Sequence, residues 1–253
     1  MGMTTQNKEK DWFGYKRVNP SDKTKMVEGV FDNVASRYDL MNDFMSVGIH
    51  RLWKNRFVQM MHPRANRKLL DVAGGTGDIA FRYRKAAGES AKITVCDINK
   101  EMLKVGRDRA IDRGYLKGFE WVEGNAESLP FDDREFHLYS IAFGLRNVTH
   151  IDNALADAWR VLKPGGQFFC LEFSHLKNAN LQKIYDEYSF RIIPKIGELV
   201  AKDRDSYQYL VESIRQFPKQ AELSSRLETA GFENVKVINL SGGIAAIHIG
   251  NKL

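Results

Sequence analysis

The sequence of 253 residues contains only two cysteines and no long hydrophobic run. Cys96 and Cys170 each lie in a short apolar run, so we expect no disulfide framework, no metal site and a reducing compartment. No stretch approaches the ~18 consecutive apolar residues of a membrane-spanning helix. The polar start, Met1 to Lys10, lacks the apolar core of a signal peptide and the arginine-rich character of a transit peptide. These absences together predict a cytoplasmic protein.

Charged and apolar residues are both plentiful, which excludes a disordered or collagen-like chain: 28% are charged and 43% are hydrophobic. Lysine and arginine total 38 and the acids 32, which gives a net charge of +6. This excess suggests an anionic partner, and a nucleic acid and an anionic membrane surface both fit. The basic residues are spread along the chain without a dense block, so an ordinary soluble surface also explains them.

From Lys68 onward, short β-branched and apolar runs alternate with helix-like stretches, as in a parallel sheet with crossover helices. Near the end, a helix closed by Gly231 precedes two runs joined by Ser241-Gly242-Gly243, which predicts a β-hairpin. We therefore predict an α/β fold with a seven-stranded, mostly parallel sheet, an antiparallel last strand and four strand-helix-strand crossovers. Strands are expected at 68–73, 92–97, 118–123, 137–142, 166–173, 234–240 and 244–249, and helices at 77–87, 100–113, 151–162 and 220–230.

Two segments fall outside this alternation. Apolar residues from Met26 to Val34 recur at helical spacing and are followed by an aromatic and methionine-rich stretch, so 12–62 is expected to form a helical cap over one edge of the sheet. The 174–219 segment is far longer than the usual ~2 to 6 residue connection and predicts a lid or substrate wall. With no internal repeat or linker, we expect a single domain over 1–253 that carries these two appendages.

A glycine-rich stretch, Asp71-Val72-Ala73-Gly74-Gly75-Thr76-Gly77-Asp78, stands where the first predicted strand turns into the first helix. Glycines there let the backbone turn tightly and approach a ligand closely. Asp97 follows at the end of the second strand, where a carboxylate can accept hydrogen bonds from both ribose hydroxyls of a nucleoside. The pattern predicts a nucleoside-containing cofactor rather than an ordinary turn beside a surface acid.

The same loop also fits the dinucleotide fingerprint G-x-G-x-x-A, so NAD has to be weighed against S-adenosylmethionine. Three features favour S-adenosylmethionine: Asp71 opens the loop where it can meet the amino-acid end of the cofactor, Asn125-Ala126 follows the third strand where an amide can read an adenine edge, and the last strand is reversed. The whole resembles a class I methyltransferase, a Rossmann-like fold with strand order 3-2-1-4-5-7-6. Ala73 departs from that pattern, which commonly has a glycine there.

Two further stretches resemble the signatures of the ubiquinone/menaquinone biosynthesis C-methyltransferase family. The first is Tyr38-Asp39-Leu40-Met41-Asn42-Asp43-Phe44-Met45-Ser46, and the second is Arg160-Val161-Leu162-Lys163-Pro164-Gly165-Gly166, running on to Glu172-Phe173-Ser174. The resemblance implies methylation of a ring carbon on a prenylated quinol, either 2-methoxy-6-polyprenyl-1,4-benzoquinol or demethylmenaquinol, or both. It also implies that Thr76, Asp97, Asn125 and Ala126 bind the cofactor and that Gly74, Gly75 and Gly77 shape the loop, while Ala142 stands where this family commonly has a serine.

Chemistry at a ring carbon requires ionisation of an adjacent hydroxyl, because the neutral ring is a poor nucleophile. Phenols ionise near pH ~10, and lowering this to ~7 requires roughly 4 kcal/mol. One cation about 4 Å away at an effective dielectric near ~20 supplies about that much. In the family-like run Phe143-Gly144-Leu145-Arg146-Asn147, we expect Arg146 to stabilise the phenolate and Asn147 to orient a hydroxyl or a water.

Two N-terminal residues are also candidates for the ring. Tyr38 is expected to hydrogen-bond the other ring oxygen, and His50 is a weaker candidate for the base. Structural interpretations stay open for all four residues: a salt bridge for Arg146, a cap for Asn147, a core aromatic for Tyr38 and a buried structural histidine for His50.

An isoprenoid tail places such a substrate in a membrane, so we expect peripheral contact with the anionic surface of an inner membrane, from the cytoplasm or, in a mature eukaryotic form, from the mitochondrial matrix. Tyr185, Tyr188 and Phe190 are candidates for the entrance, and a homodimer or a quinone-biosynthesis complex is the expected assembly. An RNA or DNA methyltransferase is the main alternative, although no basic run with interleaved aromatics is evident and we expect no nucleic-acid partner. A non-catalytic scaffold of a quinone-biosynthesis complex is the second alternative.

Overall fold

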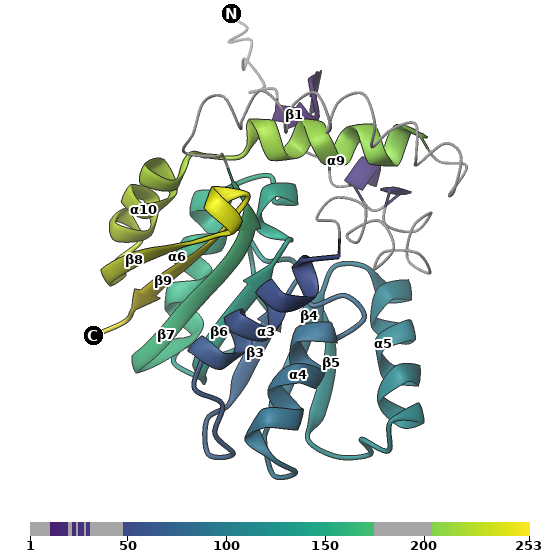
Figure 1. Ribbon diagram of the computed structural model, residues 1–253, viewed down its shortest axis with the longest axis vertical. Coiled ribbons are helices and arrows are strands. Elements are labelled where there is room, and N and C mark those ends of the chain that lie inside the picture. Colours follow the sequence, from purple (N-terminus) through teal and green to yellow (C-terminus); the bar gives the residue numbers. More distant parts are fainter. Residues whose placement is uncertain (1–10, 20–21, 24, 28, 31–47, 175–203) are drawn as a thin grey trace, which may run out of the picture.

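The computed structural model describes residues 11–19, 22–23, 25–27, 29–30, 48–174 and 204–253. Its centre is a twisted sheet of seven strands (Figure 1). These strands are β3 (Leu69–Val72), β4 (Ile93–Asp97), β5 (Phe119–Glu123), β6 (Phe136–Ala142), β7 (Leu162–Phe173), β8 (Glu233–Leu240) and β9 (Ala245–Asn251).

The strand order is β5-β4-β3-β6-β7-β9-β8. The five strands from β3 to β7 run parallel, whereas β9 is antiparallel to both β7 and β8. This confirms the predicted seven-stranded sheet with its reversed last strand. Ser241–Gly243 forms a short 3-10 turn between β8 and β9, as the hairpin prediction required.

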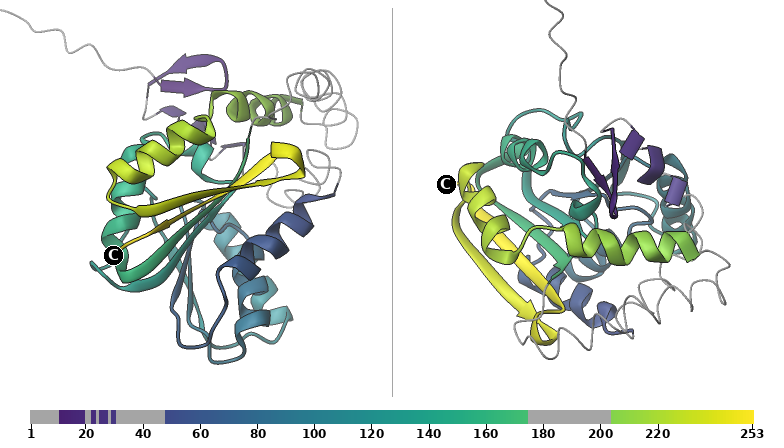
Figure 2. Two further views of the ribbon diagram at one scale, coloured as in Figure 1. Left: turned by 60° about the vertical axis from the view of Figure 1, so that its left-hand side comes forward. Right: turned by 90° about the horizontal axis from the view of Figure 1, so that it is seen from above.

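Helices cover both faces of the sheet (Figure 2). One face packs against α3 (His50–Met60), α4 (Asp78–Ala87), α5 (Lys100–Asp112) and α9 (Arg204–Gln216), through buried residues that include Phe57, Tyr83, Leu103 and Leu210. The other face packs against α6 (Ile151–Val161) and α10 (Gln220–Thr229), through Leu155, Ala158, Leu223 and Leu227. Because parallel strands are buried on both faces, β3 and β4 are mostly apolar and do not alternate between apolar and polar residues.

The prediction of four strand-helix-strand crossovers was wrong by one. Residues 124–135, between β5 and β6, form turns and an isolated bridge between Asn125 and Ser128 but no helix. The stretch lacks apolar residues at helical spacing and contains Pro130, which removes a backbone donor. The run from Lys163 to Gly166 belongs to β7, but it forms an irregularity between the pairs Phe136–Leu162 and Leu138–Gln167, with Gly165 at a φ of 76°.

The described part of the N-terminal segment is not helical throughout. Its described part begins with a small hairpin of β1 (Asp11–Phe13) and β2 (Lys16–Val18), and the described positions between 22 and 30 are helical. The Phe13 ring stacks on Tyr209 of α9 with centroids 4.2 Å apart, so tertiary contact rather than local preference places this hairpin beside α9 (Figure 1). Residues 31–47 and 175–203, which hold Tyr38 and the aromatics Tyr185, Tyr188 and Phe190, lie outside the described residues.

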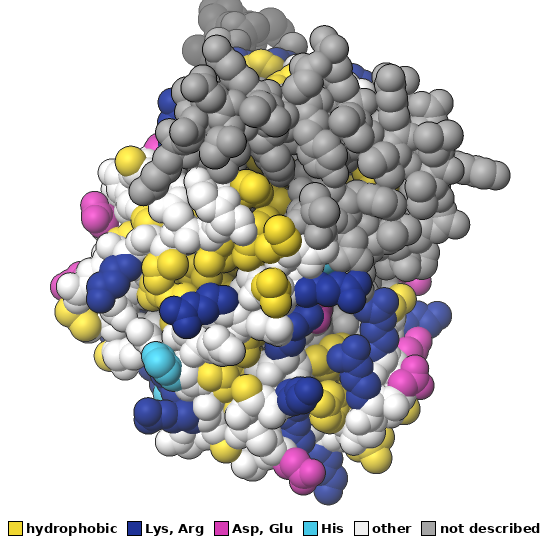
Figure 3. Space-filling model, viewed as in Figure 1, with side chains coloured by type: hydrophobic (Ala, Val, Ile, Leu, Met, Phe, Trp, Pro, Cys, Tyr) yellow, Lys and Arg dark blue, Asp and Glu magenta, His cyan; other side chains and the backbone are white. Residues whose placement is uncertain are grey.

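Hydrophobic side chains gather on the face of the molecule around β8 and β9 (Figure 3). Partly buried residues there include Ile238, Leu240, Ile244 and Ile249, which pack against the core of this face. Within the part of the chain that the structure describes, no helix is long and apolar enough to cross a bilayer.

Candidate active site

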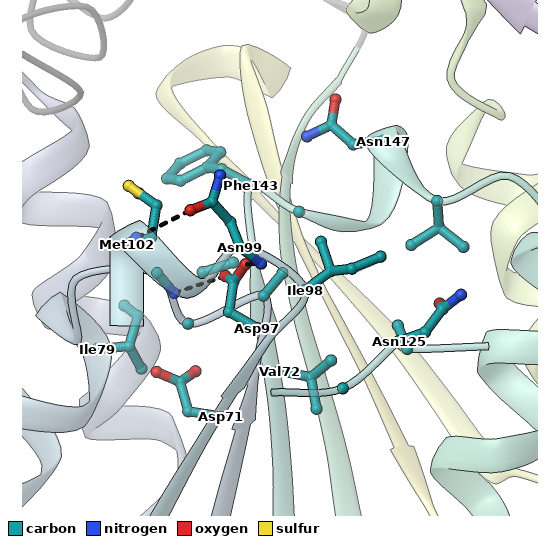
Figure 4. Close-up of a pocket in the computed structure, with 18 of the residues that line it drawn as sticks. Asp71, Val72, Ile79, Asp97, Ile98, Asn99, Met102, Asn125, Phe143 and Asn147 are labelled. Atoms are coloured by element: carbon teal, nitrogen blue, oxygen red, sulfur yellow. Dashed lines mark hydrogen bonds between the residues drawn. The ribbon is translucent and has the colours of Figure 1, made fainter. Parts of the chain in front are cut away.

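A pocket opens at the carboxyl ends of β3, β4, β5 and β6, where open α/β sheets bind their ligands. The residues that follow these strands form its wall, so positions far apart in sequence face one space. Figure 4 shows Asp71, Ile79, Asp97 and Met102 around this space, with Asn125 and Asn147 farther along its rim. Including its open mouth, the pocket holds about 1140 Å³.

The glycine loop between β3 and α4 forms the floor of the pocket. Gly75 has a φ of 51°, and a Cβ atom there would lie 2.9 Å from Met102 Cε, so a side chain would be both strained and crowded. Gly77 has a φ of 83° and ends the turn as the N-cap of α4, but it lies behind the loop and is not on the pocket wall. Ala73, the departure from the usual glycine, takes a φ of 49°, which is unfavourable for a residue with a Cβ atom.

Asp71 places a buried carboxylate at the start of this loop. Its Oδ1 accepts a hydrogen bond of 2.6 Å from the Ser140 hydroxyl, while Oδ2 is buried without a hydrogen-bond partner in the described part of the chain. Burial raises the pKa of Asp71 to about 7, and the Ser140 hydrogen bond opposes this rise. A buried oxygen of this kind is a site for a donor or cation supplied by a ligand.

Asp97 ends β4 and is held by backbone donors. Its Oδ2 accepts a hydrogen bond from Gly75 N at 2.8 Å, and its Oδ1 accepts one from Asn99 N at 2.9 Å. Burial raises the pKa of Asp97, and these backbone hydrogen bonds counter the rise. Each carboxylate oxygen keeps a second lone pair, so the group can still accept hydrogen bonds from a vicinal diol.

The other predicted cofactor residues also lie on the pocket wall: Gly74, Thr76, Asn125, Ala126 and Ala142. Thr76 is buried, and its hydroxyl accepts a hydrogen bond from Arg109 Nη1 at 2.9 Å, which leaves its own proton to donate. Asn125 uses its side-chain oxygen to accept from Glu127 N at 2.9 Å. Its amide nitrogen is therefore the group that can face a ligand.

Arg146 and Asn147 share the short helix η2 (Leu145–Asn147) after β6, but their side chains point in different directions. Arg146 is buried and forms an ion pair with Glu172, with Nη1 3.0 Å from Oε2, and it lines not this pocket but an adjacent cavity, together with Tyr209 and Ser213. Asn147 does line the pocket, and its Oδ1 accepts a hydrogen bond of 3.0 Å from the Tyr209 hydroxyl. The structure therefore brings Asn147 to this pocket and Arg146 to the adjacent cavity, and Val148 and Thr149 line both.

His50 begins α3, is 1% exposed and is not on the wall of the pocket, whereas Tyr38 lies outside the described residues. Sequence reasoning missed several residues that line the pocket, among them Lys54, Ile98, Met102 and Phe143. Ile98 and Met102 carried a local signal, because they flank Asn99, whose side chain caps α5 by accepting from Met102 N. Lys54 carried none, since only the packing of α3 on α4 brings it to the pocket.

Comparison with known proteins decides the family, because the model of the ubiE/COQ5 methyltransferase family matches residues 19–252. The chain belongs to this family. A UbiE ubiquinone/menaquinone biosynthesis C-methyltransferase from Brucella abortus is 56% identical over 95% of this chain and 90% of its own length. The corresponding protein of Brucella anthropi is 54% identical over 95% of this chain and 92% of its own.

Solved structures agree on the fold. A SAM-dependent methyltransferase from Thermotoga maritima is 19% identical with a TM-score of 0.63, and covers 89% of this chain and 99% of its own. A methyltransferase from Bacillus halodurans is 20% identical with a TM-score of 0.57, and covers 79% of this chain and 98% of its own. Members of the ubiE/COQ5 family use S-adenosylmethionine, and this chain is a SAM-dependent methyltransferase with the class I fold.

The pocket residues fit this cofactor. The buried Oδ2 of Asp71 can accept a hydrogen bond from an ammonium group, and the carboxylate of Asp97 can accept from two ribose hydroxyls. Ile98 and Ala126 provide apolar contact for a flat base, and the Asn125 amide can donate to it. These groups belong to this chain and suit the ammonium, the ribose and the adenine of the cofactor.

Proposed function

We propose that this family member methylates a ring carbon of a prenylated quinol in ubiquinone or menaquinone biosynthesis, or in both. The observation that carries this proposal is the 56% identity to UbiE C-methyltransferases over 95% of the chain. The 2-methoxy-6-polyprenyl-1,4-benzoquinol of the ubiquinone route and the demethylmenaquinol of the menaquinone route are the two substrate classes.

S-adenosylmethionine supplies an electrophilic methyl group, so the residues of this chain have to position the ring and favour its ionised hydroxyl. Asn147 is the predicted catalytic residue that lies on the pocket wall. Because the Tyr209 hydroxyl occupies its Oδ1, the Asn147 amide nitrogen is the group turned to donate a hydrogen bond to a ring oxygen or to a bridging water.

In this proposal Arg146 positions a loop and does not stabilise the phenolate directly, which was the role predicted from the sequence. Glu172 compensates its charge at 3.0 Å, and the pair is buried, so the full effect of one free cation is not available to the ring. Arg146 Nη1 also donates to the carbonyl of Phe143, whose φ of 56° is held by this contact. Arg146 and Glu172 together therefore position the loop that carries Phe143, Gly144 and Asn147.

One neutral hydrogen bond contributes about 1 kcal/mol, well below the roughly 4 kcal/mol that ionisation near pH 7 requires. Further polar groups must therefore face the ring. Tyr38, in the part of the chain outside the described residues, stays the predicted donor to the second ring oxygen. His50 stays a predicted base whose use requires a change in its buried position.

The experiment follows transfer of labelled methyl from S-adenosylmethionine to short-chain methoxy-prenyl-benzoquinol and to demethylmenaquinol, both kept reduced. We expect labelled product on at least one ring, a strong loss of turnover in Asn147→Ala, and unchanged cofactor affinity in that variant. Asp97→Asn is the matched control, because it should weaken cofactor binding instead. Transfer to RNA but to neither ring by cofactor-binding enzyme would favour the nucleic-acid alternative, and cofactor binding without transfer to any acceptor would favour the scaffold.

The same proposal includes peripheral contact with an anionic membrane, because the prenyl tail resides in a bilayer. The described N-terminal hairpin exposes Trp12 and Tyr15 beside Lys16 and Arg17, a combination of aromatic and cationic side chains that suits a lipid interface. Sedimentation with vesicles should show more binding to anionic than to neutral lipid, reduced by Trp12→Ala with Tyr15→Ser. Equal recovery with both vesicle types would remove this part of the proposal.

A further inference from the structure

The charged residues on the pocket wall are unequally divided. Four of the described lining residues are acidic, Asp71, Asp78, Asp97 and Glu127, whereas Lys54 is the single cationic one among them. S-adenosylmethionine carries two positive groups, the sulfonium and the ammonium, and one negative group, the carboxylate. The acids suit the positive groups and the ribose, so the carboxylate is matched best by a partner of opposite charge.

Lys54 is firmly held at one end of the pocket. It lies on α3, is 4% exposed, and its Nζ is 2.8 Å from Asp78 Oδ2 at the start of α4. Arg82 binds the other oxygen of Asp78, with Nε 2.9 Å from Oδ1. Burial alone would raise the pKa of Asp78, but Lys54 and Arg82 outweigh it and lower the pKa. Asp78 is thus ionised and fixes the ammonium of Lys54 at the wall.

This end of the pocket is the end that Asp71 occupies. Asp78 begins α4 directly after the glycine loop that Asp71 precedes, and both carboxylates line the pocket. The glycine loop between them brings Gly74, Gly75 and Thr76 to the same wall. An amino-acid group whose ammonium faces Asp71 can therefore place its carboxylate toward Lys54, the one cation among the described lining residues.

We propose that Lys54 binds the carboxylate of S-adenosylmethionine and so makes α3 part of the cofactor site. The N-terminal cap then has a role in cofactor recognition besides any role in covering the substrate. The assignment depends on the cofactor alone and is independent of which ring is methylated, so failure of the quinol proposal leaves it unchanged.

The test compares affinities for S-adenosylmethionine and decarboxylated S-adenosylmethionine, which lacks only the carboxylate, by calorimetry on the full chain. The variant is Lys54→Met, which keeps the length of the aliphatic stem. Arg56→Met is the matched control, because Arg56 lies on the same helix, is exposed and is not on the pocket wall. A double variant, Lys54→Met with Asp78→Asn, removes the charge of Asp78 together with that of Lys54. Thermal unfolding shows whether each variant folds.

In the wild-type protein we expect S-adenosylmethionine to bind about tenfold or more tightly than the decarboxylated compound, as is typical of hydrogen bonds to charged groups. Lys54→Met should lose that factor for S-adenosylmethionine and retain its affinity for the decarboxylated compound, in the single and in the double variant, while Arg56→Met changes neither. Equal losses for both compounds in the folded variants, or an unchanged preference for the carboxylate, would overturn the assignment.

Discussion

The buried carboxylate of Asp71 should make cofactor binding depend on pH. Its pKa is raised to about 7 by burial, so near neutral pH the carboxyl group of the free protein is partly protonated. An ammonium group binds the ionised form, which means that cofactor binding must release the proton. Because the protonated form competes, the apparent Kd should rise as pH falls below about 7.

The size of the effect follows from this pKa. If only ionised Asp71 binds the ammonium, the apparent Kd is multiplied by about 1.1 at pH 8 and by about 11 at pH 6. Asp71 alone therefore contributes a ratio of about tenfold, or roughly 1.4 kcal/mol, before loss of the ligand's ammonium proton weakens binding at pH 8. An α-amino group titrates near pH ~7.7 to 8.0, so affinity should fall again on the alkaline side, when the ammonium loses its proton.

Calorimetry in two buffers with different ionisation enthalpies measures both the affinity and the protons released. We expect about 0.8 proton released at pH 6.5 in the wild-type protein, because that fraction of Asp71 is protonated before binding. Asp71→Asn should bind the cofactor weakly at every pH, and its apparent Kd should no longer rise as pH falls below about 7 (the acid limb of the pH profile). Ser140→Ala removes the hydrogen bond that lowers the pKa, and should move the acid limb to higher pH.

The stability of the cofactor-free protein should change with pH in the opposite direction to its cofactor affinity. The folded protein holds the Asp71 proton more tightly than the unfolded chain does, so this group favours folding at acid pH and its contribution is lost as pH rises toward about 7. Asp71→Asn should therefore raise the melting temperature of the cofactor-free protein more at pH 8 than at pH 5. Binding without proton release, or an acid limb that persists in Asp71→Asn, would refute the reasoning.

Three further predictions concern the packing around the pocket. Gly144→Ala should destabilise the fold by about 1 to 3 kcal/mol in chemical denaturation, because the new Cβ would lie 2.4 Å from the Cβ of Ala73. Adding Ala73→Gly should restore stability, and an equally unstable double variant would contradict this. Glu172→Ala should cost about 3 to 5 kcal/mol in the same assay, since it breaks a buried ion pair by removing one partner. Replacing both residues by Met should recover most of the loss, and a loss no smaller in the double variant would show that the broken pair is not the cause. Tyr209→Phe retains the stack on Phe13 but removes the hydrogen bond to Asn147 Oδ1. Methyl transfer should fall several-fold and stability by about 1 kcal/mol, while cofactor affinity stays constant. An unchanged rate would show that Tyr209 does not position Asn147.

The parts of the fold that the sequence predicts well are those with strong local signals. Strands such as β4 and β6 are mostly apolar, and helices such as α6 show a clear apolar face, so the order of these elements can be predicted from the sequence. The reversed β9 follows from the short turn at Ser241–Gly243. The hairpin of β1 and β2 has three residues in each strand and depends on Phe13 stacking on Tyr209, 196 positions away, so no local pattern predicts it.

The residues of the candidate site likewise divide into those with a local sequence signal and those placed by distant contacts. The glycine loop, Asp97 and Asn125 are placed by strand ends and turn geometry, which a sequence records. Arg146 and Asn147 are adjacent in sequence and equally polar, and only the burial of Glu172 on β7 and the approach of Tyr209 on α9 decide which of them faces the pocket. Lys54 similarly reaches the wall through the packing of α3 on α4. Residues whose direction depends on distant partners are the ones whose position sequence reasoning cannot fix or misses.

The most direct test of the proposed chemistry is the position of the new methyl group. Reduced short-chain quinol is incubated with S-adenosylmethionine that carries a ¹³C-labelled methyl, and the product is examined by carbon NMR, which separates a methyl on a ring carbon from one on oxygen. We predict a single labelled methyl on the ring carbon, formed by the wild-type protein and strongly reduced in Asn147→Ala. Label on a ring oxygen, or no label on either quinol from enzyme that binds the cofactor, would contradict C-methylation of a prenylated quinol.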